Sequence, residues 1–162
     1  VPAASVAMAA GTLSLIGIAD AWEPWWLIVQ LPGLIVFFTA GLAELQRPPF
    51  DAPLAEAELV MGPITEYGGM RFAMFLLAEY AGIVVLAALT TVLYLGGWAG
   101  PWSDDFGWLW SLIKIFAVSF LVIWARVAYP RLREDQINSL AWKVLVPLAL
   151  LQLTVTTFVV VL

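Results

Sequence analysis

The chain has 162 residues, of which 63% are hydrophobic and 12% are charged, and its formal net charge is −5. Soluble domains carry about 45–50% apolar and about 25% charged residues, so this composition excludes an ordinary soluble domain and indicates a membrane-embedded one. The absence of Cys and His excludes disulfides, thiolate chemistry and imidazole-ligated metals, so any redox centre must belong to partners.

Five apolar stretches follow one another along the chain. They cover residues 1–19, 25–43, 70–95, 108–129 and 143–162. Each is long enough, or nearly so, to cross a hydrocarbon core of about 30 Å, which takes about 20 helical residues. We therefore predict an all-α fold: a polytopic transmembrane helix bundle with about five spans in a single domain, 1–162. Because the chain opens without Met inside an apolar stretch, we expect it to be a fragment of a larger subunit.

The connections between these stretches differ in charge. Those around residues 20–24 and 96–107 contain no Lys or Arg, whereas residues 44–71 and 126–143 hold all but one of the 7 cations in the chain. Basic loops of membrane proteins are retained on the cytoplasmic side. We therefore expect loops 44–71 and 126–143 to be cytoplasmic and the C-terminus to lie outside.

The first of these basic loops is also acidic, because residues 44–66 include five carboxylates. Pro48 and Pro49 end the preceding helix, and the apolar residues between the acids predict a structured loop that folds back against the bundle. Desolvation raises the pKa of a carboxyl group and a neighbouring arginine lowers it, so such a cluster can hold or pass protons. The alternative is that Glu44 and Arg47 form an ordinary i, i+3 pair and that the other acids only solvate the loop.

Two charged residues lie inside apolar stretches. Glu79 has apolar neighbours on both sides and lies about 13 Å from the start of its helix, which predicts a position near the membrane midplane. An intramembrane acid needs burial, neutralisation or a partner, and it is a functional candidate by default. Lys114 lies seven residues into the fourth stretch, and we expect it to snorkel outward or to pair with an acid.

Three arginines mark the end of the fourth stretch, namely Arg126, Arg131 and Arg133. They are typical of positive-inside anchors. Their guanidinium groups also suit pairing with the acids of the neighbouring loop or contact with a partner subunit. Both roles remain open from the residues alone.

These segments together resemble a family of membrane subunits from the NADH-quinone oxidoreductases, the enzymes that form respiratory complex I. In that family the loop after the fifth span reads approximately AETNRxPFDLPEAESELVxGxxTEYxGM, and residues 43–70 here read AELQRPPFDAPLAEAELVMGPITEYGGM. The segments FAMFLLAEYAG, LGGW, YPRLREDQ and WKVLVPLAL are also similar. The resemblance extends over nearly the whole chain.

The resemblance implies that the five stretches are the fourth to eighth spans of such a subunit, in the bacterial inner membrane. It implies a non-redox subunit that helps to form a quinone chamber and couples quinone reduction to proton translocation, and the fragment alone is not expected to be active. By motif position, the acids of the proton path are Glu44, Glu56, Glu58, Glu66 and Glu79. The residues near the chamber or the peripheral interface are Arg47, Asp51, Arg126, Arg131 and Arg133.

The resemblance also implies partners. Ubiquinone or menaquinone is a substrate, and FMN and iron–sulfur clusters belong to partner subunits, so this chain is expected to bind no cofactor or metal itself. The partners are peripheral iron–sulfur and quinone-site subunits, antiporter-like membrane subunits and the lipid bilayer, with no nucleic acid.

The chain departs from the family pattern at a few positions. Leu54 stands where the family has the first of three alternating glutamates, which removes one protonation site, and Glu134 replaces a tyrosine. Two other functions stay open. One is the homologous membrane subunit of an energy-converting hydrogenase or formate hydrogenlyase. The other is a stand-alone ion transporter, which the intramembrane acid and the Gly–Pro breaks suggest.

Overall fold

The computed structural model describes residues 1–47, 49–50, 66–101, 103–130 and 132–161. These residues form helices joined by turns. In chain order the elements are α1 (Pro2–Ala10), α2 (Leu15–Asp20), α3 (Trp26–Glu44), α5 (Met70–Tyr94), α6 (Ser103–Ala128), α7 (Glu134–Leu140), a π-helical turn (Ala141–Leu145) and α8 (Val146–Val161).

Within the described residues, four helices are long and apolar enough to cross a membrane. They are α3, α5, Phe106–Ala128 of α6, and the continuous helix Glu134–Val160 that joins α7, the π-helical turn and α8. The predicted all-α, polytopic membrane fold is confirmed.

The first apolar stretch differs from the expected continuous span. Gly11 ends α1 with φ 66°, and Ser14 is extended before α2 begins. A left-handed glycine at this position is a common helix stop because it lacks a Cβ atom. Residues 1–19 therefore form two short helices, neither of which meets the length of a membrane-crossing helix.

The last helix also begins earlier than expected. We predicted a connection over 126–143, but α7 begins at Glu134, within that range. The backbone N–H of Arg133 donates to the Gln136 side chain at 3.2 Å, and Glu134 and Asp135 stand in the first turn, where negative charge is favourable.

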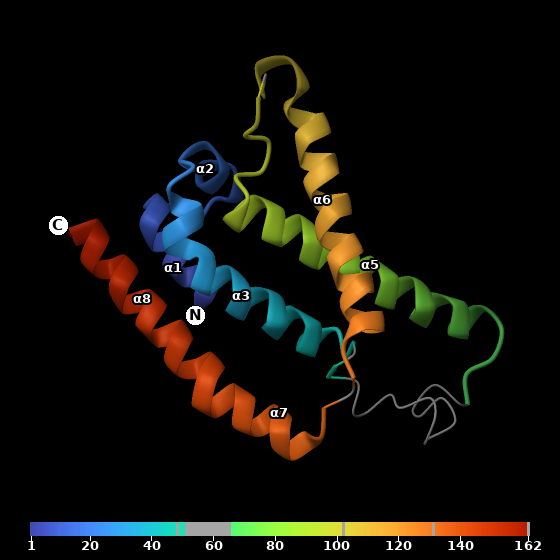
Figure 1. Ribbon diagram of the computed structural model, residues 1–162. Coiled ribbons are helices and arrows are strands. Elements are labelled where there is room, and N and C mark those ends of the chain that lie inside the picture. The colour runs from blue at the N-terminus through green and yellow to red at the C-terminus, as the bar shows by residue number, and fades with distance from the viewer. Residues whose placement is uncertain (48, 51–65, 102, 131, 162) are drawn as a thin grey trace.

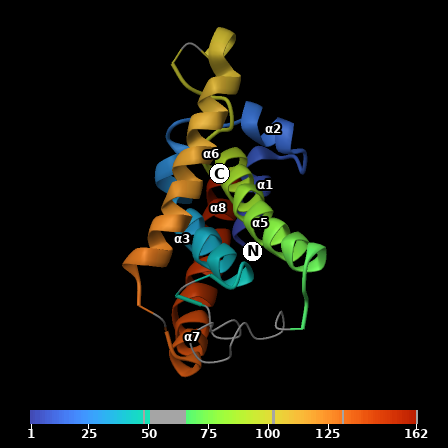
Figure 2. The ribbon, with the colours of Figure 1, turned by 90° about the vertical axis from the view of Figure 1, so that its right-hand side faces the viewer.

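Helix α3 lies between α5 and α8 (Figure 1). On one side α1 packs against both α3 and α8, and on the other α6 crosses α5. Figure 2 shows the α5–α6 connection at one end of the molecule and α7 at the other. Helices α3, α5, α6 and the last helix each run between these two ends.

Hydrogen bonds join the connections that share an end. At one end, Trp22 Nε1 donates to the carbonyl oxygen of Tyr94 at 3.1 Å. At the other, the backbone N–H of Leu132 donates to the carbonyl oxygen of Pro49 at 3.1 Å. The two connections without cations are therefore grouped together, and so are the two basic ones.

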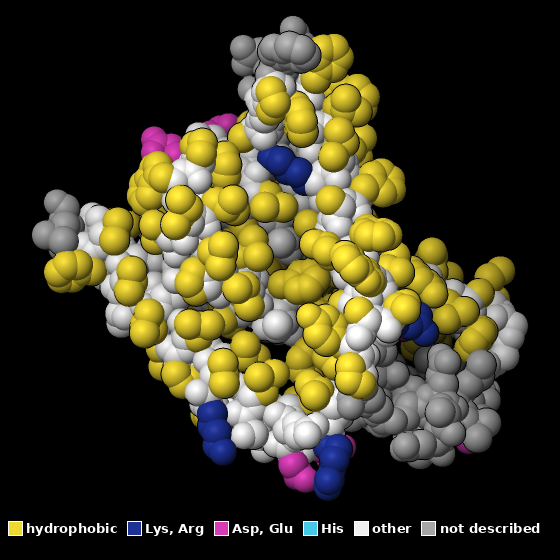
Figure 3. Space-filling view, viewed as in Figure 1, with side chains coloured by type: hydrophobic (Ala, Val, Ile, Leu, Met, Phe, Trp, Pro, Cys, Tyr) yellow, Lys and Arg dark blue, Asp and Glu magenta, His cyan; other side chains and the backbone are white. Residues whose placement is uncertain are grey.

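Hydrophobic side chains cover most of the face seen in Figure 3, and the few charged side chains lie at its lower end near α7 and at scattered places above it. Apolar surface on this scale is what a helix bundle presents to lipid or to neighbouring membrane subunits.

The crossing of α3 and α5 is close because glycines stand at it. A Cβ atom on Gly41 would lie 2.3 Å from Leu86 Cδ1, and one on Gly82 would lie 2.6 Å from Leu45 Cδ2. Small residues at helix crossings let membrane helices approach and pack. The core at this crossing consists of Leu42, Phe50, Ile83, Leu86, Val122 and Ala125.

Candidate functional site

An ion pair joins the end of α3 to the middle of α5. Arg47 Nη2 lies 3.1 Å from Glu79 Oε1, and the exposed fractions of the two side chains are 6% and 30%. The Arg47 guanidinium carbon also lies 5.0 Å from the centre of the Tyr80 ring, within the range of a cation–π interaction. A buried arginine is thus held between a carboxylate and an aromatic face.

The end of α3 directs Arg47 into this site. Gln46 has φ 49°, and the backbone N–H groups of Gln46 and Arg47 donate to the carbonyl oxygens of Ala43 and Leu42, both at 3.1 Å. This pair of bonds is a Schellman motif, which reverses the chain after a helix. Arg47 is therefore turned back toward α5 instead of continuing away from the bundle.

The residues after Arg47 fix this turn. The backbone N–H of Phe50 donates to the carbonyl oxygen of Arg47 at 2.8 Å, and the Phe50 side chain is buried in the core beneath α5 and α6. Pro49, which precedes it, is bonded to Leu132 after α6. The start of loop 44–71 is thus attached to three helices.

Arg47 has hydrogen-bonding capacity beyond this pair. Its Nε and Nη2 atoms are buried and make no hydrogen bond of good geometry to any described residue. A buried guanidinium is strongly destabilising without acceptors. The loop that continues from Arg47 contains Asp51, Glu56 and Glu58, which lie outside the described residues.

The pair explains how the chain accommodates an acid inside an apolar helix. The partner of Glu79 lies three residues beyond the end of α3, so Glu79 lies near that end, and its expected position near the membrane midplane stays a prediction. The first turns of α5, which precede Glu79 in the chain, extend beyond the end of α3 (Figure 1). The ordinary Glu44–Arg47 pair that we considered is not what Arg47 forms, because Arg47 pairs with Glu79.

The structure brings only some of the predicted site residues together. Glu79 and Arg47 meet, while Glu44 and Glu66 are exposed at the end of α3 and before α5. Arg126 is exposed in the last turn of α6, and Arg133 forms a solvent-exposed pair with Asp135 at 3.5 Å. Asp51, Glu56, Glu58 and Arg131 lie outside the described residues. The roles assigned to all of these residues remain predictions.

Lys114 makes three hydrogen bonds to backbone carbonyls that the sequence did not predict. Its Nζ donates to the carbonyl oxygens of Leu95, Gly97 and Ala99, at 2.6, 3.1 and 2.6 Å. Leu95 caps the C-terminus of α5, where a cation also complements the helix dipole. The side chain therefore reaches toward the connection that we expected to be outside, where it binds backbone carbonyls, and Lys114 fastens the α5–α6 connection to α6.

The sequence reasoning also missed a buried polar cluster between α1, α3 and α8. Gln152 Nε2 donates to Gln30 Oε1 at 3.0 Å and to the carbonyl oxygen of Val29 at 2.8 Å, and Ser5 Oγ donates to Gln30 Oε1 at 3.2 Å. Gln30, Gln152 and Ser5 are all buried. The signal that would have found them is an amide side chain inside each of two apolar stretches.

Comparison with known proteins identifies the family of the chain. A family model described as NADH dehydrogenase matches residues 1–157. The H subunit of NADH-quinone oxidoreductase from Geobacillus sp. (strain WCH70) is 47% identical over 95% of this chain and 47% of its own length. The H 1 subunit of the same enzyme from Geobacter metallireducens is 48% identical over 94% of the chain and 46% of its own length.

A third relative, the H 2 subunit from Cereibacter sphaeroides, is 50% identical over 83% of the chain and 42% of its own length. The chain spans about half the length of the curated relatives it matches. The match covers nearly all of the chain at high identity, and the chain belongs to the NADH dehydrogenase family.

Proposed function

We propose that this chain forms part of the membrane subunit of a proton-translocating NADH-quinone oxidoreductase, in which it couples quinone reduction to proton movement through carboxylates. The observation that carries the proposal is the Arg47–Glu79 ion pair, in a chain 47% identical to a protein named as a subunit of that enzyme. The pair links a loop rich in acids to an acid inside a membrane-crossing helix.

The pair suits a charge-driven switch. Arg47 is buried, so its charge interacts with neighbouring carboxylates in a medium of low dielectric constant. A negative charge that appears near the loop when quinone is reduced competes with Glu79 for Arg47. Glu79 then loses part of its stabilising partner and takes up a proton, and it releases that proton when Arg47 returns.

The surroundings of the pair support a quinone chamber at this end of the bundle. Phe50, Leu132 and the exposed Arg133 lie on the connections that meet there, and the exposed Arg126 lies in the last turn of α6. Guanidinium groups suit contact with the carboxylates of a peripheral subunit. On this proposal the end is cytoplasmic, the membrane is the bacterial inner membrane, and partner subunits hold the FMN and iron–sulfur clusters.

The test is Glu79→Gln in the full-length subunit within its assembled complex. The proposal expects normal assembly, loss of most coupled quinone reduction, and a lowered ratio of protons moved to electrons transferred. Asp135→Asn is the matched control, because Asp135 is an exposed acid at the same end that pairs only with exposed Arg133 among the described residues. Equal turnover and pumping in both variants would refute the proposal.

A further inference from the structure

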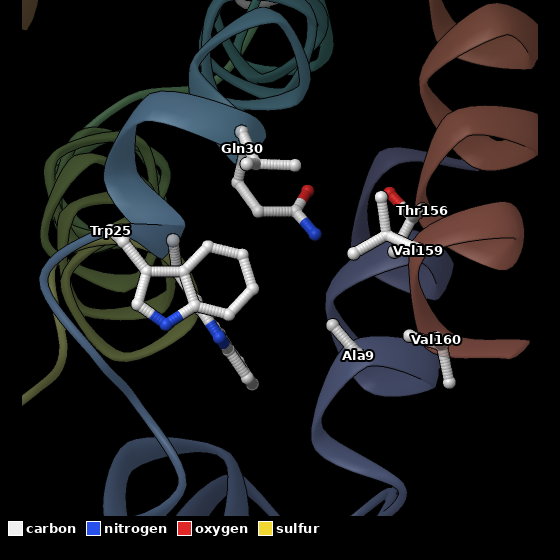
Figure 4. Close-up of a pocket in the computed structure, with 8 residues that line it drawn as sticks. Ala9, Trp25, Gln30, Thr156, Val159 and Val160 are labelled. Carbon is white, nitrogen blue, oxygen red and sulfur yellow. The ribbon is translucent and has the colours of Figure 1, made fainter. Parts of the chain in front are cut away.

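A cavity of about 290 Å³ lies between α1, α3 and α8, at the end of the bundle opposite the Arg47–Glu79 pair. Its walls are Ala9, Trp25, Trp26, Val29, Gln30, Thr156, Val159 and Val160. Figure 4 shows the amide of Gln30 reaching into the space between α3 and α8, across from Thr156 and Val159.

Two hydrogen-bond donors of the residues that line the cavity have no acceptor among the described residues. Gln30 is 4% exposed, and its Oε1 accepts bonds from Ser5 and Gln152, while its Nε2 donates to no described residue. The indole N–H of Trp26, which is 8% exposed, likewise has no described acceptor. Both residues are largely buried, and polar groups of such residues are usually satisfied by protein or by ordered water.

A third buried group lies beside the same cluster. Tyr94 is 1% exposed, and its hydroxyl has no hydrogen-bond partner among the described residues. A Cβ atom on Gly33 would lie 3.5 Å from Tyr94 Cε1, 3.5 Å from Gln30 Oε1 and 3.4 Å from Gln152 Cγ. The missing side chain of Gly33 therefore leaves space where the tyrosine ring and the two amides converge.

We propose that this cavity is a water site, whose molecules accept hydrogen bonds from Gln30 Nε2 and Trp26 Nε1. A water occupies about 30 Å³ of liquid and needs two to four polar partners, so the volume and the donors are sufficient for several molecules. Neutral donors at the base of the cavity match the oxygen of water, whereas a lipid acyl chain would leave both donors unsatisfied. The site lies away from the ion pair and does not depend on the function proposed above.

Cysteine reactivity in the full-length subunit, assembled in its membrane, tests this site. A thiol reacts as the thiolate, which forms in water and not in hydrocarbon. The variant is Thr156→Cys, because Thr156 is buried in the cavity wall. The matched control is Thr154→Cys on the same helix. Thr154 is exposed on the outer face, and its hydroxyl, like that of Thr156, donates to a carbonyl oxygen of its own helix.

The probe is a charged methanethiosulfonate reagent that does not cross membranes, added to membrane vesicles of both orientations. The chain itself contributes no other thiol, because its sequence contains no Cys. We expect Thr156→Cys to react at least about tenfold faster than Thr154→Cys, since only the first meets water. Adding Gln30→Leu to Thr156→Cys should slow the reaction, because the cavity then loses a water-binding donor.

Three results would overturn the proposal. Equal, slow reaction at both positions would mean that lipid or protein fills the cavity. Equal, fast reaction at both positions would mean that water reaches both faces of α8. An unchanged reaction rate of Thr156→Cys after Gln30→Leu would show that Gln30 does not bind the water. If Thr156→Cys does not accumulate, Val159→Cys replaces it, with outward-facing Phe158→Cys as its control.

Discussion

Replacing Glu79 and replacing Arg47 should lower the free energy of unfolding by different amounts, although each breaks the same ion pair. Glu79→Gln leaves Arg47, with 6% of its side chain exposed, as a charge without its carboxylate, and should lower the free energy of unfolding by about 3 kcal/mol. Arg47→Met leaves Glu79, whose side chain is 30% exposed and therefore less dependent on a protein partner, so the loss should be about 1–2 kcal/mol. The double variant removes both charges and should be no less stable than Glu79→Gln alone.

The assay is reversible unfolding of the full-length subunit in detergent micelles titrated with a denaturing detergent. A double-mutant cycle then gives the coupling energy between the two side chains, which we expect to be about 1–2 kcal/mol. The pairing would be refuted if the two effects added to within about 0.5 kcal/mol, the limit expected for independent sites.

Further predictions use the same assay. Lys114→Met removes three hydrogen bonds from one ammonium group and should lower stability by about 3 kcal/mol; a loss below about 1 kcal/mol would contradict its fastening role. Gln152→Leu should lower stability by about 1 kcal/mol, the usual size for hydrogen bonds between membrane helices, and no loss would mean that the amide bonds are absent. Gly41→Val should cost about 1–3 kcal/mol by overpacking, and adding Leu86→Ala should recover part of it; an unaltered loss would show that the clash lies elsewhere. Arg133→Ala should leave unfolding unchanged, because its ion pair is exposed, and a measurable loss would assign it another contact.

Much of the bundle was predictable from the sequence because membrane helices are fixed by local composition. The apolar stretches at 25–43, 70–95 and 108–129 correspond to α3, α5 and α6, whose backbone polar groups are satisfied within each helix. The charge asymmetry also predicted correctly which connections lie at the same end of the bundle.

The errors arose where a local feature competes with hydropathy. Gly11 interrupts the first stretch because it adopts a left-handed conformation that mean hydropathy does not register. The capping of α7 by Arg133 and Gln136 starts the last helix within a stretch we had assigned to a connection.

The candidate site was only half predictable for a different reason. Glu79 was identifiable as an intramembrane acid, but its partner is 32 residues away in the sequence, and several arginines were available. The choice of Arg47 depends on the reversal at Gln46 and on the burial of Phe50, which are tertiary features. The same holds for Lys114, whose three acceptors are backbone carbonyls that carry no sequence signal.

The central claim is that Glu79 changes its protonation when quinone is reduced. Infrared difference spectra of the assembled complex, recorded between oxidised and reduced quinone, measure this directly through the carboxyl C=O band. We predict a band that changes on reduction in the wild type and in Asp135→Asn, and that is absent in Glu79→Gln. Identical spectra in all three proteins would contradict the claim.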